Sequence, residues 1–128
     1  MNLQRLLTLH ALITFAAGVV LIAAPDLVPG VVGVHVPPDA YLVCYLLGAA
    51  ELAVAFLSFA GRNLRQSDAV RLVTWTMIVF HGCTAAVEVY AFARGVHAGI
   101  WANVTLRAAV IALFVRYGLR QKVQKGLS

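Results

Sequence analysis

Five side chains that carry charge or exchange protons lie inside long apolar stretches of this sequence: Glu51, Glu88, His81, Arg107 and His10. The chain has only five acidic residues, so two carboxylates in apolar surroundings are conspicuous. Two carboxylates facing one guanidinium leave one carboxylate in need of a proton or another partner, and a nearby imidazole can take up or release a proton. These residue types predict a site that transfers a proton, or that binds a cationic or hydrogen-bonding ligand.

Helical spacing predicts that these groups share one interior. His81, Thr84 and Glu88 follow the i, i+3, i+7 pattern of one helix face. Asn103 and Arg107 lie four residues apart and so share a face of another helix. Glu51 follows Gly48 on another stripe, and small residues beside polar ones allow helices to approach closely in lipid. The candidate ligand-binding or polar-core residues are Glu51, His81, Glu88, Arg107, Asn103 and His10.

These residues are predicted to lie on membrane-spanning helices. Of the 128 residues, 62% are hydrophobic and 12% charged, which is too apolar for a soluble domain. A helix of about 20 apolar residues spans the bilayer while satisfying its own backbone hydrogen bonds. We therefore expect an all-α, up-down four-helix transmembrane bundle, with residues 1–128 forming a single membrane domain. The predicted helices cover residues 3–24, 40–60, 68–93 and 98–118, and a basic tail covers residues 119–128.

The first segment and the long link after it need separate interpretation. The apolar run of residues 3–24 is longer than the core of a signal peptide, at about 7 to 15 residues, so we expect it to be a retained helix. In residues 25–39 the prolines and glycines are expected to stop helices, with the apolar middle lying along the membrane interface.

Basic residues predict the orientation in the membrane. One side is expected to hold Arg5, Arg62, Arg65, Arg71, Arg116, Arg120, Lys122 and Lys125. The other side has only Arg94, with Asp26 and Asp39. The positive-inside rule then places both termini in the cytoplasm. This asymmetry accounts for most of the net charge of +5, so no nucleic-acid partner is expected. The basic tail serves as a topology anchor, with contact to anionic lipid as the alternative.

Counting about 1.5 Å per residue along each helix predicts the depth of the polar groups. Glu51, His81 and Arg107 fall near the midplane, whereas Glu88 and Asn103 fall nearer the outer surface. His10 falls nearer the cytoplasmic surface, about two helical turns from His81. The third helix is expected to neighbour both the second and the fourth, so that its polar face lies between Glu51 and Arg107.

Sharper chemical alternatives are a haem held by His10 and His81, or a metal bound by His81, Glu51 and Glu88. The haem site is disfavoured because His10 and His81 are predicted to lie at different depths in the membrane. The metal site is disfavoured because the sequence lacks the Glu-x-x-His repeats of di-metal bundles. We therefore expect no metal and no cofactor. Cys44 and Cys83 fall at different depths and are expected to be unpaired packing residues.

Three short segments carry a family resemblance: Leu6-Leu7-Thr8-Leu9-His10-Ala11, Ala24-Pro25-Asp26 and Leu47-Gly48-Ala49-Ala50-Glu51-Leu52. In these the chain resembles small bacterial four-helix membrane proteins of the DoxX-like kind, whose second-helix glycine and acidic residue look like Gly48 and Glu51. The resemblance implies a multi-pass protein of the bacterial cytoplasmic membrane. Most such proteins lack an assigned activity, and one relative is a subunit of a quinone-reducing thiosulfate dehydrogenase.

A second, architectural likeness is to the emopamil-binding sterol isomerases and sigma-2 receptors, which place acidic residues and a histidine inside a small helical bundle. It implies that Glu51, His81 and Glu88 could hold a cationic amine or a carbocation-like state.

The preferred hypothesis is a membrane protein that binds an apolar or amphipathic molecule (a lipid, quinone or amine) between its helices. One alternative is an isomerase-like enzyme that uses the same carboxylates and histidine in acid–base chemistry. Another is an accessory subunit that meets a membrane partner or a second copy of itself. A purely structural polar core is the fourth possibility.

Overall fold

The computed structural model describes residues 2–119, and this part of the chain is helical with no β-strand. The long helices are α1 (Leu3–Ala23), α3 (Tyr41–Gly61), α4 (Ser67–Ala93) and α5 (Ile100–Phe114). Shorter turns are α2 (Leu27–Val31), the 3-10 turn η1 (Pro38–Ala40) and the π-helical turn η2 (Val115–Leu119). The predicted basic tail, apart from its first residue Leu119, lies outside the described residues.

Four helical segments are long and apolar enough to span a membrane: α1, η1 with α3, α4, and α5 with η2. Their ends lie within about two residues of the predicted ones, which confirms the all-α, four-span fold class. Large apolar side chains are exposed on the outer faces, among them Leu42 (64%), Phe56 (73%) and Val87 (65%). Such faces are typical of contact with lipid, because soluble monomers rarely expose contiguous apolar surface of this kind.

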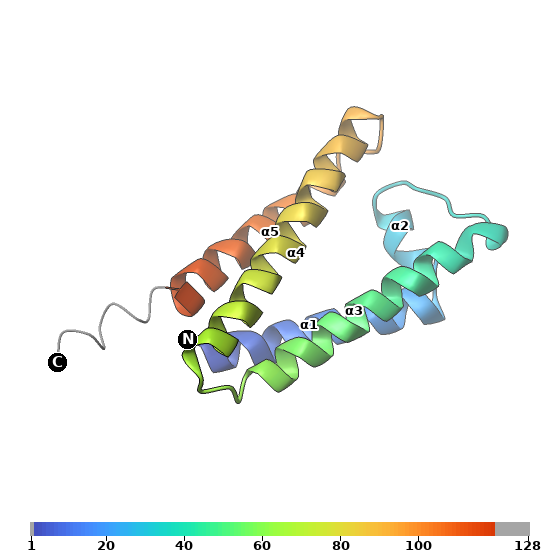
Figure 1. Cartoon of the computed structure of the whole chain (residues 1–128). Helices are drawn as coiled ribbons and strands as arrows, with labels where there is room; N and C mark the ends of the chain where they lie inside the picture. The colour runs from blue at the N-terminus through green and yellow to red at the C-terminus, as the bar shows by residue number, and fades with distance from the viewer. Residues whose placement is uncertain (1, 120–128) are drawn as a thin grey trace.

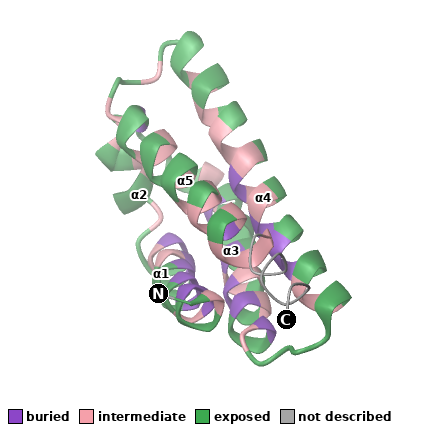
Figure 2. Cartoon of the chain, turned by 90° about the vertical axis from the view of Figure 1, so that its left-hand side faces the viewer, coloured by how far each residue is buried: buried purple, intermediate pink, exposed green. Residues whose placement is uncertain are grey.

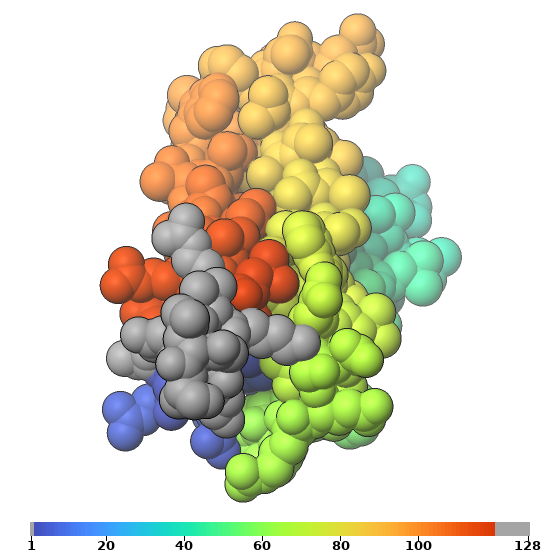
Figure 3. All heavy atoms as spheres, turned by 60° about the vertical axis from the view of Figure 1, so that its left-hand side comes forward, coloured from blue at the N-terminus to red at the C-terminus, as the bar shows by residue number. Residues whose placement is uncertain are grey.

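The helices pair as two hairpins that meet at one end and diverge toward the other (Figure 1). One hairpin is α1 with α3, and the other is α4 with α5. We call the end that holds Leu3, the 62–66 turn and Leu119 the closed end. The opposite end, which holds Ala23, α2 and the 94–99 turn, is the open end. The space-filling view shows α4 and α5 side by side (Figure 3).

Two glycines allow α1 and α3 to pack closely. A Cβ atom added to Gly18 would lie 2.9 Å from the backbone oxygen of Gly48. A Cβ atom added to Gly48 would lie 2.8 Å from the backbone oxygen of Gly18 and 2.7 Å from Ile22 Cγ1. Each glycine therefore makes room for the other helix, which is how small residues act in membrane helix pairs. The predicted small-residue stripe is confirmed at this crossing.

A compact apolar cluster joins the two hairpins near the closed end. Its buried members are Leu6, Leu7, Val73, Met77 and Phe114. Figure 2 shows that buried residues gather on α1 and on the middle of α4, whereas the outer helix faces are exposed. The cluster holds the hairpins together below the level at which they diverge, so polar groups just beyond it are brought close across the hairpin boundary.

The expected neighbours of α4 are only partly right. α4 packs along α5, but it makes few contacts with α3, which instead packs along α1. The physical reason is the glycine crossing: α1 and α3 approach so closely that they form one unit, and α4 meets this unit mainly at the closed end.

The link between α1 and α3 folds back over the open end. A short helix, α2, forms at Leu27–Val31, where Pro29 and Gly30 were expected to stop helices. Pro29 is accommodated there because it lies in the first turn, where a helix needs no backbone N–H. The hydroxyl of Tyr41 donates to Asp26 Oδ2 at 2.5 Å, which ties the start of α2 to the start of α3. The link is thereby held beside the mouth between the hairpins.

Candidate functional site

A connected set of polar side chains crosses all four spanning helices just above the apolar cluster. We call it the polar relay, and in order it consists of Ser58, His10, His81, Arg107, Glu88 and Asn103. The two imidazoles form its centre, with 2.7 Å between His10 Nε2 and His81 Nε2. Both histidines are buried, at 6% and 8% exposure.

Aromatic packing fixes the two imidazole rings. The rings of His10 and His81 meet edge to face with centroids 5.0 Å apart. Phe114 packs against His10 and Phe80 against His81, each also edge to face. Since rings held on several sides cannot rotate freely, the nitrogen atoms keep their partners.

From Arg107 to Ser58 the donors of the relay all point the same way when both imidazoles are neutral. Arg107 Nη1 lies 3.3 Å from His81 Nδ1, and because a guanidinium only donates, that nitrogen accepts. The single ring hydrogen of His81 is then on Nε2, which donates to His10 Nε2. His10 in turn carries its hydrogen on Nδ1 and donates to Ser58 Oγ at 2.8 Å. The Ser58 hydroxyl donates to the backbone oxygen of Val54 at 3.0 Å, so every member has a partner.

At the other end of the relay, Glu88 receives two donors on the same oxygen. Arg107 Nε donates to Glu88 Oε1 at 2.9 Å, and Asn103 Nδ2 donates to it at 2.5 Å. The second oxygen, Oε2, is buried and has no hydrogen-bond partner within residues 2–119. Glu88 therefore retains capacity to accept one more donor.

Glu51 is the carboxylate that the relay leaves out. It is 9% exposed and lines the same cavity as Glu88 and Arg107. Among the described residues it forms neither a hydrogen bond nor an ion pair, and the one ion pair found there joins Arg107 to Glu88. The site thus holds two carboxylates and one guanidinium, and the guanidinium is already paired with Glu88.

The cavity lies between the diverging hairpins on the open-end side of the relay and has a volume of about 960 Å³. This volume suits a small molecule, since ligand cavities measure about 300–1,000 Å³. Its walls are mostly apolar and come from all five α-helices and the link. They include Leu21, Val28, Val31, Val43, Leu47, Ile100 and Leu106. The polar lining residues are Glu51, Thr84, Glu88, Asn103 and Arg107 from the helices and His35 from the link.

The structure brings together five of the six predicted site residues in the relay and places the sixth, Glu51, on the cavity wall. The depth predicted for His10 is wrong, because its ring contacts His81 directly. Counting residues from helix ends assumes parallel, upright helices, and the two hairpins cross at an angle (Figure 1).

The direct contact between the imidazoles also bears on the haem alternative. Metal–nitrogen bonds of about 2.0–2.1 Å on opposite sides of an ion would hold the two nitrogens about 4 Å apart. The observed 2.7 Å between the Nε2 atoms is a hydrogen-bond distance instead. For the other alternative, residues 2–119 contain no group of three His, Cys, Asp or Glu side chains placed to hold a metal ion. Both cysteines are free, and Cys44 is buried against the cavity.

Ser58, which is fully buried and ends the relay, was not among the predicted site residues. A signal for it was present, because Ser58 follows Glu51 by seven residues and so lies on the same helix stripe. Serine is common in apolar helices as a small residue bonded to its own backbone, so its position alone did not mark it.

No protein-family model, no curated protein and no solved structure matches this chain in the comparisons made.

Proposed function

We propose that this chain binds an amphipathic small molecule in the cavity between its hairpins, with a cationic amine-type head at Glu51. The observation that carries the proposal is the charge arrangement on the cavity wall. Arg107 is paired with Glu88, whereas Glu51 faces the same space without a partner. A carboxylate in apolar surroundings must bind either a proton or a cation, so an ammonium head competes with a proton for this group.

The remaining walls fit the apolar part of such a ligand. Leu21, Val43, Leu47 and Leu106 come from three different helices and line the cavity beside the carboxylate. An alkyl chain placed against them gains about 25 cal/mol for each Å² of apolar surface removed from water. The polar group thus supplies orientation and selectivity, and the walls supply most of the affinity.

An acid–base reaction on an apolar substrate is the second candidate function, and one observation favours it. Between His81 and Ser58 the two imidazoles and the hydroxyl form one chain of donors that runs in a single direction. A proton can move between the two imidazoles and Ser58 by reversal of these donors, which a binding site does not require, whereas Arg107 only donates and so separates this chain from Glu88. Turnover that fails when His81 is changed to Phe, with amine binding retained, would favour this function over simple binding.

The location proposed for the chain is the bacterial cytoplasmic membrane, with the closed end toward the cytoplasm. This is supported by Arg5, Arg62, Arg65 and Arg71, which belong to the closed end, against Arg94 at the open end. The cavity would then open toward the outer leaflet. Kinship with DoxX-like proteins remains part of the same proposal.

A comparison of headgroups tests the binding proposal. The protein in phosphatidylcholine nanodiscs is titrated with octylamine, 1-octanol and octanoate, which share one chain length, and its unfolding temperature is followed. Binding to the folded state raises stability as RT ln(1 + [L]/Kd), so octylamine should raise the temperature most and octanoate least. The isosteric variant Thr84→Val changes the same wall without changing charge and should keep this order. Equal shifts for all three compounds would contradict a cationic ligand.

A further inference from the structure

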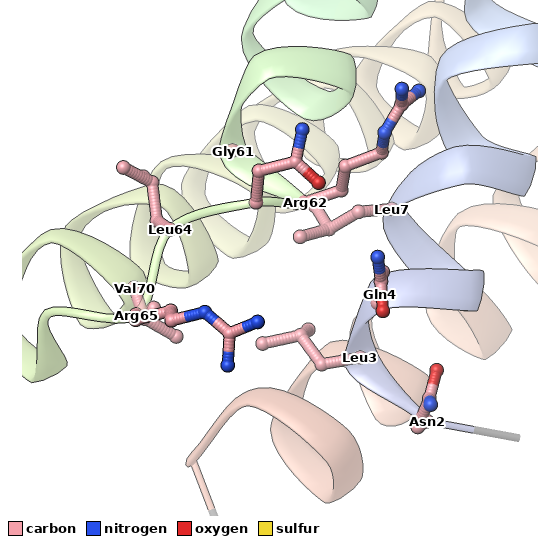
Figure 4. Close-up of a pocket in the computed structure, with 10 residues that line it drawn as sticks. Asn2, Leu3, Gln4, Leu7, Gly61, Arg62, Leu64, Arg65 and Val70 are labelled. Carbon is pink, nitrogen blue, oxygen red and sulfur yellow. The ribbon is translucent and has the colours of Figure 1, made fainter.

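A second cavity lies at the closed end, on the other side of the apolar cluster, with a volume of about 530 Å³. It is formed by the first turns of α1, the turn between α3 and α4, and the first part of α4. Figure 4 shows Asn2 and Gln4 on one side and Arg65 on the other, with Leu3 between them. Arg62 and Leu7 also line it. No residue of this cavity belongs to the polar relay.

The charge of the second cavity is opposite to that of the first. Two arginines line it and no carboxylate does. The Arg65 side chain extends into the space toward Leu3 (Figure 4). Neither arginine forms an ion pair within residues 2–119, where the one ion pair found is that of Arg107. The backbone adds to the positive potential, because α1 begins at Leu3 and its dipole is positive at that end.

The remaining lining combines hydrogen-bonding and apolar groups. Asn2, Gln4 and Asn63 contribute carboxamides, and the Asn2 oxygen is already engaged by the backbone N–H of Arg5. Its amide nitrogen is therefore the group that remains to donate. Leu3 and Leu7 supply apolar surface directly beside these groups. The same small space thus offers guanidinium groups, amides and a route toward the apolar flank of the helices.

We propose that the closed-end cavity binds the headgroup of an anionic phospholipid. The phosphodiester lies against Arg65, and the Arg62 guanidinium, which packs 3.4 Å from the centroid of the Phe59 ring, adds positive charge beside it. The glycerol hydroxyls lie against the carboxamides, and the acyl chains leave along Leu3 and Leu7. Arginine suits a phosphate because its planar fork donates two parallel hydrogen bonds. A soluble phosphate ester would share the arginines but leave the leucines uncovered. The position at the ends of spanning helices also favours a lipid, since headgroups lie at that level.

Spin-labelled lipids test this assignment. The full chain is reconstituted in phosphatidylcholine vesicles with a minor fraction of spin-labelled phosphatidylglycerol or, in parallel, spin-labelled phosphatidylcholine. The motionally restricted fraction then reports the selectivity of the protein for the anionic lipid. Charge-assisted hydrogen bonds from a guanidinium to a phosphate contribute on the order of tenfold in affinity or more, so the double variant Arg62→Gln/Arg65→Gln should lose more than about tenfold of the preference. The variant Arg62→Lys/Arg65→Lys keeps the charge and should retain part of the preference.

A matched control separates the cavity from general surface charge. Arg71→Gln/Arg116→Gln removes the same charge from the same end but does not touch the cavity. It should leave most of the preference in place, and an equal loss in both double variants would overturn the proposal. In a last experiment, glycerol 3-phosphate is added to the aqueous phase, and displacement of the spin-labelled lipid is measured. Failure to displace the labelled lipid supports a lipid site, whereas displacement at low millimolar concentration would assign the cavity to a soluble phosphate ester and overturn it.

Discussion

Replacing Arg107 with methionine is expected to destabilise the folded protein strongly, because it leaves the buried Glu88 carboxylate without its cationic partner. In the structure Arg107 Nε donates to Glu88 Oε1 at 2.9 Å, and the two side chains are 14% and 13% exposed. Without the guanidinium, Asn103 is the one donor left to Glu88. Removing one partner of a buried ion pair costs about 3–5 kcal/mol. We expect about 3 kcal/mol, the lower limit, because both side chains border the cavity.

A second substitution, at Glu88, tests whether the unpaired carboxylate causes the loss of stability. Changing Glu88 to Gln in the same chain removes the stranded charge while keeping an acceptor for Asn103. The double variant Glu88→Gln/Arg107→Met should therefore recover to within about 1 kcal/mol of the original protein, since replacing a whole buried pair is often close to neutral.

Reversible unfolding in mixed micelles of dodecylmaltoside and dodecyl sulfate, followed by circular dichroism, measures these free energies. Arg94→Met is the matched control, because Arg94 lies in the exposed turn after α4 and should change stability by no more than about 0.5 kcal/mol. A cost of less than about 1 kcal/mol for Arg107→Met, or a double variant as unstable as the single one, would show that the ion pair does not hold the Glu88 charge in place.

Three further predictions concern packing, the relay and topology. Gly18→Ala should destabilise by about 1–3 kcal/mol through overpacking against α3, whereas Gly82→Ala, where an added Cβ meets nothing within 4 Å, should stabilise by about 0.5–1 kcal/mol in the same unfolding assay. Ser58→Ala should cost about 1–3 kcal/mol by leaving the His10 Nδ1–H without an acceptor, and nitrogen NMR of the ring should show that hydrogen on Nδ1 in the parent protein; a hydrogen on Nε2 would contradict the assigned direction. A cysteine introduced as Asn63→Cys should react with an impermeant maleimide from the cytoplasmic side, and labelling from outside would reverse the orientation.

The helices and the polar residues could be predicted because both are local properties of the sequence. Apolar run length fixes where a spanning helix begins and ends, and the cost of a charge in lipid marks Glu51, Glu88 and Arg107 as interior groups. Gly48 could likewise be assigned to a close helix contact, because a small residue beside Glu51 on one stripe allows another helix to approach closely in lipid.

The pairing of the hairpins and the contact between His10 and His81 could not be predicted in the same way. In a soluble protein the polar face of a helix distinguishes outside from inside, but here lipid-facing and buried residues are both apolar. Depth counted along one helix also carries no information about the angle between two hairpins. The cavity follows from that angle, so its presence and its lining by Glu51 required the three-dimensional structure.

Calorimetric titration of the reconstituted protein with octylamine, in the parent chain and in Glu51→Gln at one pH, measures directly whether Glu51 binds the head of the ligand. We expect at least tenfold weaker binding in the variant, because a charge-assisted hydrogen bond contributes about 1.5–3 kcal/mol. Cys44→Ala, which alters the same wall without removing charge, should bind octylamine as the parent does. Equal affinity in the parent and in Glu51→Gln would contradict the assignment of Glu51 as the group that binds the head of the ligand.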